Sequence, residues 1–140
     1  MNAPILQPIV VLVAWSLVML IWMFVIRMAG AKYIPKDKTK TGMRGQDMEG
    51  LVPDWVQWPS HNYNHLMEQP TIFYAVALAL AFAGAGDGLN AQLAWAYTGL
   101  RILHSLVQAT FNAIGARFPL WAISSIVLMV LTVRALLLVF

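Results

Sequence analysis

Four long apolar blocks constrain the fold of this chain more than any other feature. They cover about residues 5–28, 66–86, 91–113 and 119–140, and the membrane spans predicted from them cover about 5–28, 62–86, 91–113 and 119–140. A helix needs roughly 20 apolar residues to cross about 30 Å of hydrocarbon. Hydrophobic residues make up 60% of the 140 residues, and the mean hydropathy is +0.68, which is too apolar for an ordinary soluble domain. We therefore predict one all-α domain over residues 1–140, an integral membrane four-helix bundle with four spans.

The distribution of basic residues predicts the orientation of these spans. The first loop, residues 29–61 with its flanking Arg27, holds six Lys and Arg, the second connection holds none, and the third holds only Arg117. The positive-inside rule therefore places loops one and three in the cytoplasm, with both termini and loop two outside. No basic residue precedes the first apolar run, so we expect a span there and not a cleaved signal.

The charge and cysteine content narrow the function classes. The net charge of +3 arises mainly in the first loop, so we predict no nucleic-acid partner and expect the basic run at 36–44 to touch anionic lipid headgroups. Cysteine is absent, which excludes disulfides, thiolate catalysis and Cys-ligated metals. The absence of cysteine and of an organelle-targeting sequence favours a bacterial inner membrane.

The third block carries a polar stripe in apolar surroundings. At about 100° per residue, one helical face collects the polar side chains Arg101, His104, Ser105, Gln108 and Asn112. Lipid offers these groups no hydrogen-bonding partners, so the stripe must face a protein interior or a water-filled cleft.

A second stripe lies at the start of the second predicted span. His61, Asn64, His65 and Glu68 follow one another at i, i+3, i+4 and i+7, the spacing of one helical face. Pro70 follows closely, so we expect the helix to begin near Glu68 or to be kinked there. Histidines at i and i+4 are also a zinc-binding spacing, but the sequence offers no fourth convergent ligand, and we predict no metal site. The two stripes are expected to face each other or the stripe of a neighbouring subunit.

Two segments make the chain resemble the MAPEG family, the membrane-associated proteins in eicosanoid and glutathione metabolism. One is Glu68-Gln-Pro-Thr-Ile-Phe-Tyr, which is similar to the acid-then-proline opening of the family's second helix. The other is Arg101-Ile-Leu-His-Ser followed by Arg117, which is similar to the third-helix motif and the arginine after it. The length, the four spans and the basic first loop agree, so the resemblance covers nearly the whole chain.

The resemblance implies a homotrimer with glutathione in a cytoplasmic-side cleft between subunits. Carried over to this chain, Arg117 is expected to stabilise the glutathione thiolate. The residues expected to bind glutathione or to brace the cleft are His61, Asn64, His65, Glu68, Arg101, His104 and Gln108. The implied function is that of a glutathione transferase or peroxidase acting on a lipophilic substrate from the bilayer.

The residues also leave a non-catalytic interpretation open. His61, His65 and Gln108 stand where family members often have an arginine, an asparagine and a tyrosine, which favours an accessory subunit or a lipid or quinone binder that no longer binds glutathione. Arg101 and His104 are also consistent with a buried structural network, and Glu68 with a helix-start carboxylate. Arg117 is equally consistent with a basic anchor at the membrane surface.

Overall fold

The computed structural model describes residues 3–140 and contains, over that range, four α-helices and three short 3-10 helices. The α-helices are α1 (Leu6–Gly30), α2 (Asp54–Phe82), α3 (Gly88–Thr110) and α4 (Ile114–Val139), and the 3-10 helices are η1 (Ala31–Tyr33), η2 (Lys36–Lys38) and η3 (Gly45–Met48). The all-helical prediction is confirmed.

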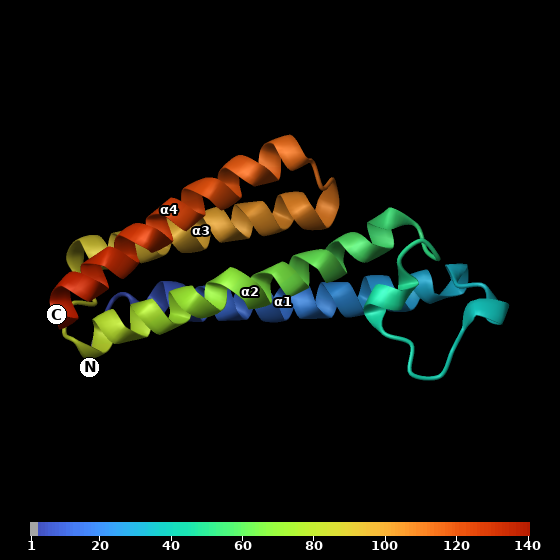
Figure 1. The fold of residues 1–140 in the computed structure, drawn as a ribbon, viewed down its shortest axis with the longest axis horizontal. Helices are drawn as coiled ribbons and strands as arrows, with labels where there is room; N and C mark the ends of the chain where they lie inside the picture. The colour runs from blue at the N-terminus through green and yellow to red at the C-terminus, as the bar shows by residue number, and fades with distance from the viewer. Residues whose placement is uncertain (1–2) are drawn as a thin grey trace.

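The helices run up and down beside one another. Figure 1 shows an α1–α2 hairpin lying against an α3–α4 hairpin, with the start of α1, the α2–α3 connection and the end of α4 at one end of the bundle. The segment 31–53 and the turn between α3 and α4 point toward the other end. The basic first loop and Arg117 therefore lie on the same side of the bundle.

The exterior of the bundle is strongly apolar along α1 and α4. Val10, Ile21, Phe24 and Leu137 are each more than 60% exposed. Within the described residues, α1 continued through η1 and α4 are the two helices long and apolar enough to cross a membrane. The prediction that α2 and α3 also span stays a prediction. Their 29 and 23 residues supply enough length at about 1.5 Å per residue, but both carry polar stripes.

The core lies where α1, α2 and α3 meet. Leu12 and Phe73 are completely buried, and the Phe73 and Tyr97 rings stack with centroids 4.4 Å apart. A second, smaller cluster of Met48, Val52 and Val56 packs the segment 31–53 onto the end of α1. The α2 helix begins at Asp54, directly after Pro53 and inside the segment predicted as a loop over 29–61. Of the two expectations for this helix, the start near Glu68 is wrong, because α2 runs through both Pro59 and Pro70, and the kink stays a prediction.

The turn between α3 and α4 shortens the polar stripe predicted on the third block. α3 ends at Thr110, and Asn112 adopts a left-handed backbone conformation with φ of 48°. Asparagine tolerates this region better than most residues, so it can reverse the chain here. Asn112 therefore does not continue the polar face of α3. The α4 helix starts at Ile114 and accommodates Pro119 near its beginning.

Candidate functional site

Arg101 forms the centre of the contact between the two polar stripes. Its side chain is completely buried, and its Nη2 lies 2.9 Å from His65 Nδ1 and 3.1 Å from the His65 carbonyl oxygen. A guanidinium can only donate hydrogen bonds, so His65 Nδ1 accepts and the ring proton is on Nε2. This arrangement ties α3 to α2 and sets the orientation of the His65 ring.

His104 stacks on His65 from the next turn of α3. The ring centroids are 4.9 Å apart and the planes are inclined by 20°. His104 is buried and His65 half-buried. The two stripes therefore meet within one chain at Arg101, His65 and His104, which is one of the two arrangements expected from the sequence.

A cavity of about 200 Å³ opens beside this pair of rings. His65 and His104 line it together with Gln108 from α3 and Arg117 from α4. Ile114, Phe118 and Trp121 complete the wall with apolar surface. Arg117 donates from Nη1 to Asn112 Oδ1 over 2.5 Å, so the turn that ends α3 also positions this guanidinium. Four of the eight predicted site residues thus share one cavity.

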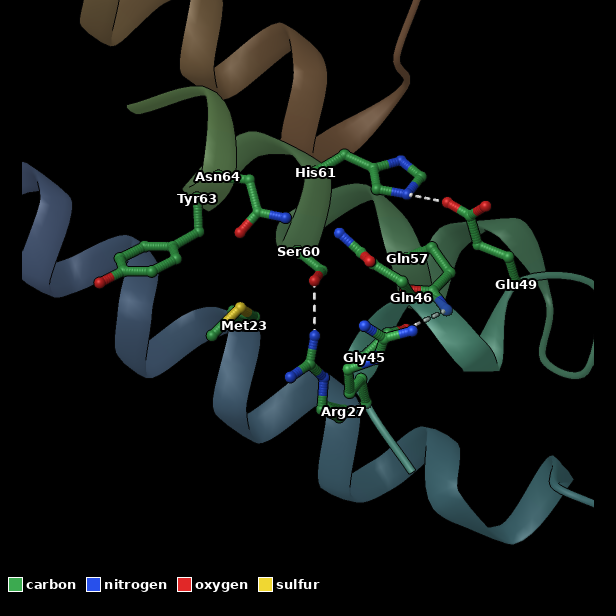
Figure 2. Close-up of a pocket in the computed structure, with 11 residues that line it drawn as sticks. Met23, Arg27, Gly45, Gln46, Glu49, Gln57, Ser60, His61, Tyr63 and Asn64 are labelled. Carbon is green, nitrogen blue, oxygen red and sulfur yellow. Dashed lines mark hydrogen bonds and ion pairs between the residues drawn. The ribbon is translucent and has the colours of Figure 1, made fainter. Parts of the chain in front are cut away.

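The other half of the second stripe lies elsewhere. His61 and Asn64 line a separate cavity, shown in Figure 2, and His61 Nε2 lies 2.8 Å from Glu49 Oε1. Glu68 is exposed and lines neither cavity. The carbonyl oxygen of Glu68 accepts a hydrogen bond from Thr71 Oγ1 at 2.6 Å. A single chain therefore does not gather His61, Asn64 and Glu68 around Arg117.

Several buried polar atoms near these residues have no hydrogen-bond partner among residues 3–140. They are both amide atoms of Asn62, Tyr74 Oη, Arg101 Nε and Nη1, and Gln108 Oε1. Buried polar groups normally find a partner in protein, water or ligand. Gln108 Oε1 is the one that belongs to a cavity-lining side chain, so it offers an acceptor to an N–H group of a bound molecule.

Some polar contacts were not expected from the sequence. Arg27 on α1 donates to Ser60 Oγ at 2.5 Å, and Trp15 Nε1 donates to Ser105 Oγ at 2.9 Å. Gln69 Nε2 donates to Ser125 Oγ at 2.7 Å, which joins α2 to α4. For Arg27, the sequence offered one signal, its place beside the basic first loop, which lies at the same end of the bundle as Arg117.

No group of three His, Cys, Asp or Glu side chains in the range 3–140 is arranged to hold a metal ion. His61 turns toward Glu49 while His65 contacts Arg101. The i, i+4 spacing therefore does not bring the two rings to a common point.

The comparison with family models identifies one match. The model described as the MAPEG family matches residues 5–137, which is nearly the whole chain. Neither the curated proteins nor the solved structures contain a significant match.

Proposed function

Because this chain belongs to the MAPEG family and is a membrane protein of that type, we propose that it uses glutathione to modify a lipophilic substrate. In one reaction the thiolate sulfur bonds to an electrophilic carbon, and the adduct takes up the proton or loses its leaving group. In the other, two glutathione molecules are oxidised to the disulfide while a hydroperoxide is reduced to an alcohol and water. The observation that carries this proposal is the cavity in which Arg117 from α4 meets His65, His104 and Gln108 from α2 and α3.

The residues present suit a thiol peptide. A guanidinium in a poorly hydrated site favours the thiolate over the thiol, which is the form that attacks electrophiles. Arg117 supplies the guanidinium, and it is half-buried in a wall whose Phe118 and Trp121 keep the site poorly hydrated. Gln108 Oε1, which has no partner among the described residues, would accept a peptide or ammonium N–H. The thiolate supplies the electron pair, and the protein holds and orients it.

The proposed assembly is a homotrimer that completes the site. The cavity of about 200 Å³ is smaller than the roughly 300–1,000 Å³ typical of small-molecule sites. Glu68 is an exposed carboxylate on a helix that we propose to span the membrane, and charges at such positions normally face a partner. A neighbouring subunit would supply the missing wall and bring Glu68 to the thiol peptide.

The proposed location is a bacterial inner membrane with α2 and α3 as further spans. The segment 31–53 and Arg117 would face the cytoplasm, because basic loops are retained on that side. The lipophilic substrate would enter from the bilayer along the apolar surfaces of α1 and α4. His61 and Asn64 remain predicted binding residues that would act only if the neighbouring subunit approaches their cavity.

A second candidate function is that of an accessory protein without chemistry. The contacts of Arg101 with His65 and of His61 with Glu49 favour it, because they engage predicted site residues in internal bonds. The contact of the buried Arg101 with His65 can serve only to specify the fold, and the exposed His61–Glu49 contact can serve only to hold the first loop on α2.

Calorimetry with glutathione and the detergent-purified protein separates the two functions. We expect saturable binding that weakens about tenfold or more in Arg117→Ala, since a hydrogen bond to a charged group contributes about 1.5–3 kcal/mol. Arg134→Ala is the matched control, because Arg134 bonds to Asn90 near the opposite end of the bundle. Absence of binding at millimolar glutathione would contradict the enzyme and support the accessory protein.

A further inference from the structure

A second cavity, of about 320 Å³, lies between the end of α1, η3 and the beginning of α2. Figure 2 shows its wall: Arg27 and Met23 from α1, residues of the η3 region, and Gln57, Ser60, His61 and Asn64 from α2. It shares no lining residue with the cavity around Arg117. Within one chain it is therefore separate from the cavity in which Arg117 is proposed to hold the thiolate.

Arg27 provides an uncompensated positive charge in this cavity. Its Nη2 donates to Ser60 Oγ at 2.5 Å, which engages only one of the five N–H groups of the guanidinium. Over residues 3–140, the side-chain ion pairs are Arg44 with Asp47 and His61 with Glu49. No carboxylate in that range thus lies within 4.0 Å of Arg27, and the remaining N–H groups can bind an anion.

The other charged groups of the wall are already engaged. Glu49 Oε1 lies 2.8 Å from His61 Nε2, and Arg44 lies 3.4 Å from the Asp47 carboxylate. The amide of Asn64 and the amide of Gln46 also line the cavity and add neutral donors. A cation with amide donors nearby matches an anion that has several acceptor oxygens.

The main chain of η3 lies directly against the Arg27 guanidinium. A Cβ atom placed on Gly45 would lie only 2.4 Å from Arg27 Nη2, so a side chain at this position would have to displace the guanidinium. Gln57 Nε2 donates to the Gly45 carbonyl oxygen at 3.3 Å and keeps η3 in this position. The geometry of the cation therefore depends on a glycine at position 45.

The position of the cavity relative to the membrane surface indicates which anion reaches it. Arg27 is in the last turn of α1, one of the two helices apolar enough to cross a membrane, so it lies near the headgroup level. The Tyr33 and Trp55 rings, with centroids 6.2 Å apart, are aromatic side chains of the kind found at that level. Lys32, Lys36, Lys38 and Lys40 follow Arg27 in the first loop, and basic residues of this kind attract anionic lipids.

We propose that this cavity binds the phosphate group of an anionic phospholipid through Arg27, with Ser60 and Asn64 as neighbouring polar groups. A guanidinium matches phosphate in geometry as well as charge, whereas the lysines act as point charges that raise the local lipid concentration. The lipid would hold η3 and α2 against the end of α1.

Native mass spectrometry of the full chain released from phosphatidylglycerol and phosphatidylcholine nanodiscs tests this site. We expect phosphatidylglycerol to be retained on the wild-type protein and phosphatidylcholine to be lost. Arg27→Gln should lower retention about tenfold, as expected for loss of a charge-assisted hydrogen bond. Lys36→Gln removes the same charge outside the cavity and should change retention less than twofold. Gly45→Ala keeps the charge but displaces the guanidinium, and should also lower retention.

Three results would overturn the proposal. The first is that Arg27→Gln retains as much phosphatidylglycerol as the wild type, and the second is that Arg27→Gln and Lys36→Gln lose equal amounts. The third applies if Arg27→Gln does not fold, and it is that a folded Gly45→Ala protein retains as much lipid as the wild type. Inorganic phosphate added to the released protein distinguishes the source of the group. Displacement of the lipid only above millimolar phosphate supports a lipid site, whereas displacement at micromolar phosphate would replace the lipid by free phosphate.

Discussion

The hydrogen bond between Trp15 and Ser105 is a residue-scale link between α1 and α3. Ser105 is completely buried and accepts from Trp15 Nε1 at 2.9 Å. Ser105→Ala and Trp15→Phe should show a coupling energy of about 0.5–1.5 kcal/mol in a double-mutant cycle, because either change leaves the other group unpaired. The coupling energy is obtained from the free energies of unfolding of the wild type, both single variants and the double variant in mixed micelles. Additive effects would show that the bond contributes no net stability.

Arg101 allows a direct test of whether the buried network stabilises the bundle. Its guanidinium is buried with Nε and Nη1 unpartnered in the part of the chain described. Arg101→Met fills most of the space without the charge, and apolar replacement of buried ionic groups is often neutral. Arg101→Ala also leaves a cavity and should lose about 2–4 kcal/mol relative to Arg101→Met. Measuring the free energy of unfolding of both variants shows whether the buried network stabilises the bundle. If Arg101→Met is as unstable as Arg101→Ala, the polar contacts with His65 hold the helices together.

At the scale of elements, Gly30 sets how closely the end of α1 approaches the beginning of α2. A Cβ on Gly30 would lie 2.3 Å from Val56 Cγ1, a branched side chain with little freedom to move. Gly30→Ala should therefore lower the free energy of unfolding by about 1–3 kcal/mol through overpacking. Gly30→Ala combined with Val56→Ala should recover part of that loss. An unchanged stability in the single variant would mean that the two helices separate easily.

The η3 helix carries a pH-dependent contact at its beginning. The Arg44 backbone N–H donates to Asp47 Oδ2 at 2.8 Å and, together with the Arg44 guanidinium, holds the pKa of Asp47 below its usual value of 3.8. A lowered carboxyl pKa adds stability that is fully present above pH 3.8 and is lost as the pH falls through the lowered pKa. We expect amide protection over residues 45–48 to fall on acidification, measured by NMR hydrogen exchange.

Two variants check the origin of this pH dependence. Asp47→Asn should abolish it. Arg44→Gln should retain part of it, because the backbone N–H remains and is the larger cause of the lowered pKa. A pKa of Asp47 above 3.8 in the wild-type protein would contradict the contact.

At the scale of the whole molecule, the proposed trimer can be tested through the absence of cysteine. Glu68 is exposed and does not line the cavity of Arg117 within one chain. If a neighbouring subunit joins them, chains carrying Glu68→Cys should form disulfides with co-expressed chains carrying Arg117→Cys. The native sequence contains no cysteine that could compete. Native mass spectrometry should give three times the chain mass of 15.6 kDa. A monomer without cross-links would exclude the shared site.

The family and the helical class could be predicted from the sequence, and both are confirmed, whereas the roles of the site residues stay predictions. Apolar blocks and helical spacing are local properties, because each helix closes its own main-chain hydrogen bonds whatever its neighbours are. The stripe of Arg101, His104 and Gln108 could be read for this reason, and the three side chains are buried together on α3.

The tertiary structure alone decided which polar groups meet. His61 and His65 share a helical face, yet one contacts Glu49 in the first loop and the other contacts Arg101 on α3. Likewise, Asn112 leaves the stripe because the chain reverses there, and Arg27 reaches Ser60 across the α1–α2 contact. These contacts depend on how loops and helices pack over long sequence separations, and no local pattern encodes the distance between two helices or the path of the chain that joins them.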